Sequence, residues 1–308
     1  MLKWETVKEY KEVIYEKARP GFSAVARVTL NRPERMNALS LELRKEMWDA
    51  LDNAAADDEV NVVIIKGAGR CLSTGASLEQ VGYVYGWKDP KPGEKKPSTN
   101  MRSRLRYDAK NFQDAWQGVL LYPKVTIVQA HGYLLGQALD TFLHCDFIIG
   151  AEDCKFGEIE DRLGIAGLTL SPIWVLRCGL THALDLCITG RIIDGNEAAR
   201  IGLLNWAVPA DKLEENVNNL AEGIARYPRD GIALGKASRR LLYDILGVTK
   251  GYGHAGVMHS LQTNIHFEEG EFAFFKERRN MGVKEAIHAR NKYYELLDNP
   301  EGKKLDKE

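Results

Sequence analysis

Residues 124–152, KVTIVQAHGYLLGQALDTFLHCDFIIGAE, hold the pattern that decides the fold class. The apolar run at 124–132 is typical of a buried strand, and DFIIGAE at 146–152 is typical of a second strand. A short helix is expected between them, beginning at Gly136. Strands that alternate with helices in this way indicate an α/β fold with a largely parallel sheet.

The same alternation continues toward the N-terminus. VARVTL (25–30) and NVVIIKG (61–67) are predicted strands, and the stretch between them at 39–56 has roughly helical spacing of its apolar residues. Another helix is predicted over 107–122. After Pro172 four successive stretches are expected to be helical: 173–190, 195–204, 212–227 and 231–247.

These patterns divide the chain into a core over residues 1–210 and a helical C-terminal region over 211–308. The segment 82–100, GYVYGWKDPKPGEKKPSTN, is rich in Gly, Pro and Lys and has little periodicity, so it is expected to form a long surface loop or lid of the core. The alternative is a flexible linker between two domains.

Composition excludes several classes of protein. The 308 residues are 44% hydrophobic and 28% charged, with a formal net charge of -1, so there is no basic excess for a nucleic-acid backbone. No apolar run approaches the ~18 residues of a membrane helix. The charged N-terminus, MLKWETVKEYKEVIYEK, lacks the apolar region of a signal peptide. We therefore expect a cytoplasmic protein with no nucleic-acid or membrane partner.

The metal-binding residue types give no metal-site pattern. The five cysteines lack CxxC spacing and mostly lie in apolar runs, which is typical of reduced thiols in a core. The seven histidines show no HExxH or similar spacing. The sequence therefore predicts no metal site.

Two stretches, 69–80 (GRCLSTGASLEQ) and 131–146, share a strand, a tight turn of small residues and then an expected helix. The turns at 74–76 and 136–138 let main-chain N–H groups point outward, and the first turn of a helix adds partial positive charge. Two such turns facing each other would hold one oxyanion, such as a thioester oxygen during enolate formation. The alternative is that glycine only marks a loop.

Acidic residues follow the second turn. Asp140 lies on an apolar segment, where it is either catalytic, a residue favoured by the helix dipole, or an ion-pair partner of His144. Glu158, Glu160 and Asp161 cluster after a predicted strand, and in an extended segment the two glutamates would share a face. Clustered acids suit proton transfer near neutrality, whereas a solvated acidic edge is the alternative.

Four segments in this order resemble the enoyl-CoA hydratase/isomerase (crotonase) superfamily, over about residues 10–250. The resemblance implies a spiral of ββα units with a helical C-terminal trimerisation region. It also implies an enzyme that acts on acyl-CoA thioesters, with coenzyme A as part of the substrate and no permanently bound cofactor, in a homotrimer or a dimer of trimers. The segments are NRPERMNALS, VVIIKGAGRCLSTGASLEQ, VQAHGYLLGQALDTFLHCDFIIGAEDCKFGEIEDRLGIAG and LCITGRIIDGNEAARIGLLNWAVP.

The resemblance also implies roles for individual residues. The backbone N–H groups of Ala76 and Gln137 would form the oxyanion hole, and Asp140 and Glu160 would be the catalytic acids. The residues expected to bind coenzyme A or the acyl group are Met36, Ala38, Leu39, Ser73, Gly75, Ser77, Leu78, Gly136 and Lys276.

Departures from the family pattern bear on the reaction. Ser77 stands where an aspartate is common, Gln137 brings a side chain to a turn that is often GGG, and Asp140 is shorter than the glutamate of hydratases. With the long segment 82–100 and its aromatic residues, these changes favour a branched, cyclic or aromatic acyl group on a 2-enoyl-CoA that the enzyme hydrates. The alternatives are an enoyl- or dienoyl-CoA isomerase, a hydrolase or hydratase-lyase that breaks a C–C bond, and a noncatalytic binding homologue.

Overall fold

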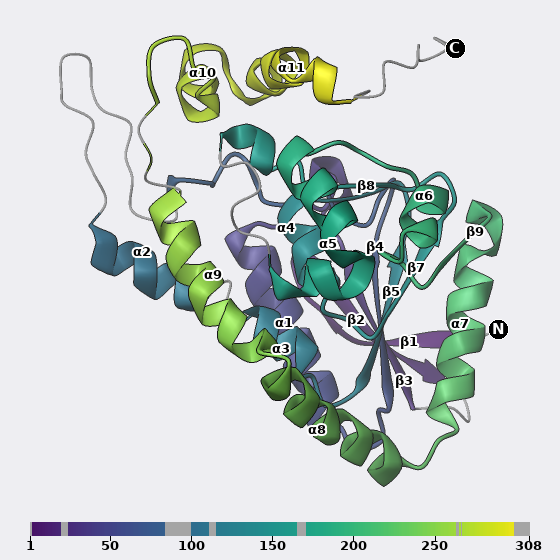
Figure 1. Cartoon of the computed structure of the whole chain (residues 1–308). Coiled ribbons are helices and arrows are strands. Elements are labelled where there is room, and N and C mark those ends of the chain that lie inside the picture. Colours follow the sequence, from purple (N-terminus) through teal and green to yellow (C-terminus); the bar gives the residue numbers. More distant parts are fainter. Residues whose placement is uncertain are drawn as a thin grey trace.

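A computed structural model gives the fold of the chain (Figure 1). Of the predicted loop 82–100, residues 84–99 lie outside the described part, and the tyrosine and tryptophan of that segment at positions 85 and 87 lie there too. The structure describes residues 2–19, 24–83, 100–110, 115–164, 171–262, 265 and 267–298.

The described strands form one large sheet and one small one. In the large sheet the first three strands pair antiparallel, and every later neighbour pairs parallel, which confirms the expected α/β class. The small sheet is a parallel pair of β6 (Tyr133–Leu135) and β8 (Lys155–Gly157). The order in the large sheet is β1 (Lys3–Glu9), β2 (Val13–Arg19), β3 (Val25–Leu30), β4 (Val62–Gly67), β5 (Val125–Ala130), β7 (Phe147–Ala151) and β9 (Trp206–Val208).

Helices cover both faces of the large sheet, with α1 and α3 on one side and α7 on the other (Figure 1). The apolar residues of the strands are buried between these layers, and the five cysteines lie in the interior as free thiols, as expected. The helices are α1 (Leu41–Ala56), α2 (Met101–Asp108), α3 (Ala115–Leu120), α4 (Gly136–Phe142), α5 (Pro172–Thr189), α6 (Gly195–Arg200), α7 (Leu213–Ala225), α8 (Arg229–Ile245), α9 (Val248–Gln262), α10 (Phe274–Met281) and α11 (Val283–Tyr293).

Of the helix expected over 107–122, the structure describes the end of α2, at Asp108, and α3, which begins at Ala115, and residues 111–114 between them lie outside the described part. Helix α9 was not predicted, because the glycines of GYGHAG lower helix propensity. Packing explains this helix: a Cβ at Gly251 would lie 2.4 Å from Cγ of Pro172, so glycine lets α9 approach the start of α5.

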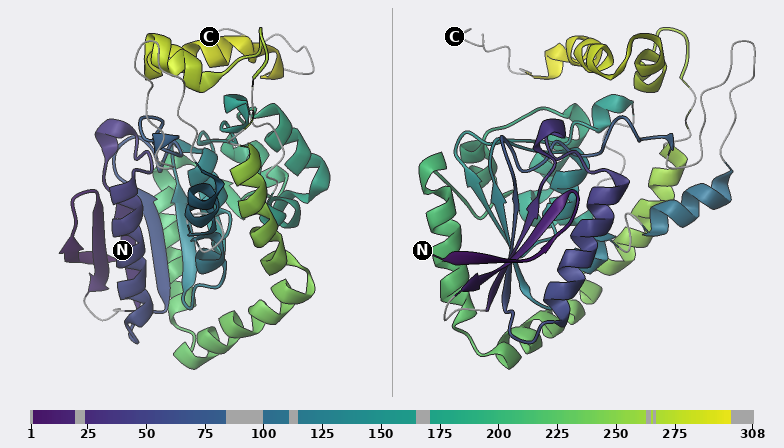
Figure 2. Two further views of the ribbon diagram at one scale, coloured as in Figure 1. Left: turned by 90° about the vertical axis from the view of Figure 1, so that its left-hand side faces the viewer. Right: turned by 180° about the vertical axis from the view of Figure 1, so that it is seen from behind.

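The C-terminal helices α10 and α11 lie over one end of the molecule (Figure 2). Leu163, Phe274 and Ala286 form a small second core there, apart from the main one. Arg278 ties α10 to the segment after the first small-residue turn, since its Nη1 donates to the carbonyl oxygens of Leu78 and Val81 at 2.6 and 2.9 Å. Helix α7, which follows residue 210, packs on the large sheet together with the core. The boundary between the core and the C-terminal region at residue 210 stays a prediction.

Within the described residues, no helix combines the length and the apolar character needed to span a bilayer.

Candidate active site

The two small-residue turns lie against each other. Main-chain hydrogen bonds join them, from Ser73 N to Tyr133 O at 3.0 Å and from Leu135 N to Ser73 O at 3.2 Å. The predicted segment around Met36 holds the first turn from the other side, because Leu39 N donates to Gly75 O at 2.8 Å. Neighbouring strand ends thus bring together residues that are about sixty positions apart in the sequence.

Two main-chain N–H groups converge on one oxygen atom. Ala76 N and Gln137 N donate to the same atom, Glu160 Oε1, at 3.2 and 2.9 Å. Gln137 is the second residue of α4, so its N–H is one of the helix's free donors. The helix predicted after the first turn is not seen over residues 78–82, which form turns instead. The convergence of the two N–H groups does not need this helix, because Ala76 N points outward from the turn itself and reaches Glu160.

The acidic segment is not extended, which corrects the expectation that Glu158 and Glu160 share a face. Strand β8 ends at Gly157, and Glu160 has helical backbone angles of φ -70° and ψ -24°. The turn sends the two side chains to different neighbours. Glu158 lies close enough to the Asp140 carboxyl group to affect its pKa, whereas Glu160 accepts hydrogen bonds from the two N–H groups.

Asp140 has three neighbours that define its chemistry. Its carboxyl group accepts a hydrogen bond from Trp174 Nε1 at 2.6 Å, and the Glu158 carboxyl group lies beside it. The alternative of an ion pair with His144 is wrong, because His144 Nδ1 faces the main-chain oxygen of Asp140 at 2.7 Å. Burial lowers the pKa of His144 to about 3, so this imidazole is neutral.

Burial raises the pKa of Asp140 to about 7, against the opposing effect of the Trp174 hydrogen bond. Burial, and next the charge of Asp140, likewise hold the pKa of Glu158 well above its ordinary value. Each of the two carboxyl groups therefore favours its protonated form more than an exposed carboxyl group does. Such a pair can donate a proton as well as accept one.

This proton has a consequence for stability. The pKa of Asp140 is 3.8 ordinarily and about 7 in the fold, so between these values the folded chain binds more protons than the unfolded one. The free energy of unfolding contributed by Asp140 is then largest at low pH and falls as the pH rises through this interval. Asp140→Asn should remove that slope, which urea unfolding at about pH 4.5 and about pH 7.5 measures. The exposed Asp58→Asn is the control, and equal slopes in wild type and Asp140→Asn would contradict the assignment.

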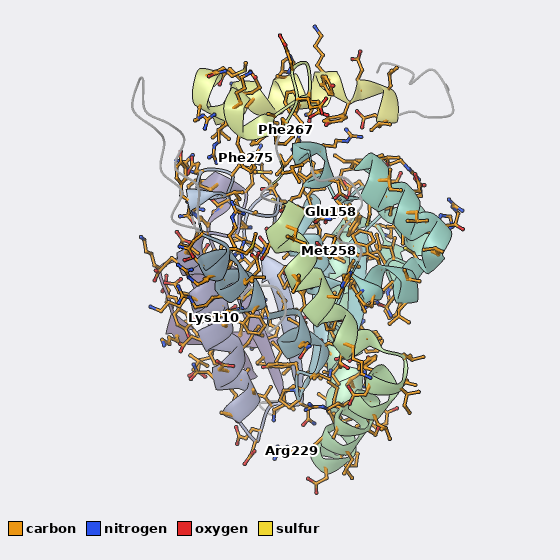
Figure 3. All side chains as sticks on the ribbon, turned by 60° about the vertical axis from the view of Figure 1, so that its left-hand side comes forward. Lys110, Glu158, Arg229, Met258, Phe267 and Phe275 are labelled. Atoms are coloured by element: carbon orange, nitrogen blue, oxygen red, sulfur yellow. The ribbon has the colours of Figure 1, made fainter. Side chains whose placement is uncertain are left out.

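Two clefts meet at the oxyanion turn, where Ala76 and Ser77 line both. The first, here named the Phe275 cleft, runs beneath α10, and Figure 3 shows Phe267 and Phe275 between the C-terminal helices and the rest of the molecule, with Glu158 deeper inside. Its apolar lining includes Leu39, Leu41, Val81, Leu163, Ile265, Phe267 and Phe275, and its polar lining includes Arg44, Tyr107, His259, Gln262 and Lys276.

The second, here named the arginine cleft, lies on the other side of the turn. Among the described residues that line it, four arginine side chains outnumber two carboxylates, Glu79 and Asp298, which favours a negatively charged ligand. Its lining residues also include Met36, Ala38, Leu78 and Ile287, and the arginines are Arg32, Arg35, Arg162 and Arg290.

The structure therefore brings together most of the predicted site residues. Ala76 and Gln137 meet at Glu160, and Asp140 lies on α4 close enough for the charge of Glu160 to act on it. Ser73 is fully buried and its hydroxyl donates to Asn37 O at 2.7 Å, so it supports the turn from inside. The others line the Phe275 cleft (Leu39, Ser77, Lys276), the arginine cleft (Met36, Ala38, Ser77, Leu78) or form the buried backbone of the turns (Gly75, Gly136).

Sequence reasoning missed several residues. Trp174 was not among the predicted site residues, because the sequence carries no signal that this tryptophan reaches Asp140. Arg44 lies on α1, where its Nη2 donates to the Gln137 side-chain oxygen and so draws that side chain toward α1. Arg32 and Arg35 lie in the segment NRPERMNALS, and their positive charge could have marked them as candidates for binding a negatively charged ligand. The cleft residues of α9 could not be found because that helix was not predicted.

Comparisons with known proteins find a matching family model and similar solved structures. The family model described as "Enoyl-CoA hydratase/isomerase" matches residues 21–285. A hydroxycinnamoyl-CoA hydratase-lyase of Pseudomonas fluorescens is 29% identical over 223 residues, which are 72% of this chain and 73% of that protein. The crystal structure of an enoyl-CoA hydratase from Mycobacterium smegmatis superposes with a TM-score of 0.76 at 26% identity, covering 92% of this chain and 95% of the other. An enoyl-CoA hydratase/isomerase from Xanthobacter autotrophicus Py2 gives 0.75 at 28% identity, with coverage of 92% and 99%.

Proposed function

This chain belongs to the enoyl-CoA hydratase/isomerase family, and on that premise we propose that it adds water to the double bond of a 2-enoyl-CoA thioester. The observation that carries the proposal is the convergence of Ala76 N and Gln137 N on one oxygen atom. In the reaction the thioester oxygen takes the place of Glu160 Oε1. The two N–H groups then stabilise the negative charge that develops on this oxygen as the enolate forms.

The displaced Glu160 carboxylate and the Asp140 carboxyl group provide the proton chemistry. Water is held between them, its oxygen bonds to C3 of the enoyl group, and the enolate takes a proton at C2 from Glu160, which received it from the water. The protonated Asp140–Glu158 pair donates a hydrogen bond that orients the water. No resident cofactor enters this scheme.

The two clefts divide the substrate between them. The positive charge of the arginine cleft suits the phosphates of coenzyme A. The Phe275 cleft then receives the acyl group, and its leucine, isoleucine and phenylalanine lining supports a branched, cyclic or aromatic acyl group.

One other reaction has a specific observation in its favour. The similarity to a hydroxycinnamoyl-CoA hydratase-lyase supports a hydration that is followed by C–C cleavage. A panel of linear, branched, cyclic and aromatic enoyl-CoAs, incubated in water labelled with heavy oxygen, separates the two. A product with an intact carbon skeleton and one labelled hydroxyl supports the hydratase. A shortened skeleton supports the hydratase-lyase, and an unlabelled isomer or no turnover would overturn the proposal.

We also propose that the chain assembles as a homotrimer or a dimer of trimers. Helix α8 supports this, because Leu234, Leu241 and Ile245 are 71%, 66% and 73% exposed in the single chain, an unusual density of exposed apolar side chains on one helix. Ile245→Glu should reduce the mass measured by sedimentation to that of one chain, since a buried unpaired charge would oppose association. Leu296→Glu, at a residue that is 83% exposed outside α8, is the control and should leave the mass unchanged. A wild-type chain that sediments as a monomer would refute the assembly.

A further inference from the structure

A buried amide without a partner lies in the Phe275 cleft. Gln262, the last residue of α9, is 5% exposed and lines this cleft. Within the described part of the chain, neither its Nε2 nor its Oε1 has a hydrogen-bond partner. Leaving a buried donor and a buried acceptor unpaired costs stability, so such a group in a native protein calls for an explanation. A ligand group in the cleft would supply both missing hydrogen bonds.

The end of α9 that carries Gln262 is held firmly. Asp108 of α2 is fully buried and binds two residues of α9: its Oδ1 lies 3.3 Å from His259 Nδ1, and its Oδ2 accepts a hydrogen bond from the Ser260 hydroxyl. These contacts fix the last turn of α9 against α2. The Gln262 amide is therefore presented to the cleft from a positioned helix end, beside His259 and the Tyr107 ring of α2, which line the same cleft.

The chemistry of an amide selects its ligand. Its Nε2 only donates and its Oε1 only accepts, so a hydroxyl group, which does both, satisfies the two atoms. A carboxylate would leave Oε1 unpaired, and a hydrocarbon would leave both atoms unpaired. Ile265 and Phe267 are among the apolar groups that line the same cleft, so a hydrocarbon suits the remainder of the acyl group.

The geometry points to acyl-CoA substrates whose acyl group carries a hydroxyl, alcohol or phenol, that hydrogen-bonds to the Gln262 amide in the Phe275 cleft. This inference rests on the proposed function, because it assigns that cleft to the acyl group. Gln262 is then a residue that determines specificity and takes no part in the proton transfer.

Binding of saturated thioesters, which cannot be hydrated, tests the inference directly. The probes for calorimetry are 3-phenylpropanoyl-CoA and its ortho-, meta- and para-hydroxy and para-carboxy derivatives. At least one hydroxy isomer should bind about 10-fold or more tightly than the unsubstituted compound, the scale of an unmet buried hydrogen bond. Equal affinities, or the tightest binding by the carboxy derivative, would overturn the inference.

Two variants assign the preference to the amide. Gln262→Met keeps the length of the side chain without its polar atoms, and it should abolish the preference for the hydroxy compound while the unsubstituted compound binds as before. Gln117→Met is the matched control, since Gln117 lies on α3 outside both clefts and bonds to Thr249 O at 3.1 Å. A preference that survives Gln262→Met would contradict the role of Gln262.

Turnover of the corresponding unsaturated thioesters separates this inference from the proposed function. Hydration of hydroxylated and plain cinnamoyl-CoA at equal kcat/KM would refute the inference and keep the hydratase. A clear binding preference without turnover would refute the hydratase and keep the inference. If none of these thioesters binds, both the inference and the proposed hydratase function are overturned.

Discussion

Glu160→Gln is expected to lower kcat by about 10²- to 10⁴-fold with the fold intact, because a glutamine amide cannot take a proton from water or return it to carbon. The fold should persist because the amide oxygen of glutamine can still accept the hydrogen bonds that Ala76 N and Gln137 N now donate to Glu160 Oε1. The measurement is kcat with the best enoyl-CoA of the panel, together with thermal unfolding.

The exposed Glu152→Gln is the matched control for this variant and should keep wild-type turnover. If Glu160→Gln turns over substrate as fast as the wild type, Glu160 has no part in the proton transfer. The observed carboxylate between the two N–H groups would then serve only to stabilise the turns.

Gly75→Ala is expected to lower kcat by about 10²- to 10³-fold, the usual loss for one oxyanion donor. Gly75 has φ of +91°, a conformation that L side chains rarely adopt, and an added Cβ would lie 2.8 Å from Leu135 O. Relief of this clash must shift the turn and move the N–H of the next residue, Ala76, away from Gln137 N. The loss should appear in kcat more than in KM, because the interaction strengthens as charge develops.

Gly223→Ala is the control for the added methyl group. Gly223 lies on α7, and a Cβ added there would meet no neighbouring side chain or segment within 4 Å. This variant should leave kcat unchanged. If Gly75→Ala retains wild-type kcat while Gly223→Ala behaves as expected, the thioester oxygen does not bind between these two turns.

The local sequence pattern was sufficient to predict the main strands and helices of the core. Strands at 25–30 and 61–67, the helix between them and the short helix at Gly136 were all predicted, and β3, β4, α1 and α4 confirm them. The family and its fold also followed from motifs that are contiguous in the sequence, and the family match and the superposed structures confirm both. Apolar periodicity and glycine turns depend mainly on near neighbours, so a single sequence carries them.

The partners of several buried side chains were beyond prediction. Whether Glu158 and Glu160 share a face depends on the turn after β8, and which partner Asp140 binds depends on where α5 places Trp174. The fold of α9 depends on its approach to Pro172, which no propensity reveals.

The sequence by itself determined the α/β class, the family and the residues of the two turns, because each of these is carried by local pattern. Only the tertiary structure decided that the N–H groups of Ala76 and Gln137 converge on Glu160 Oε1, that Asp140 lies beside Glu158, and that Gln262 lines the Phe275 cleft. The physical reason is that burial and distance between segments far apart in the chain set hydrogen-bond partners and pKa values, and neither is encoded in spacing along the sequence.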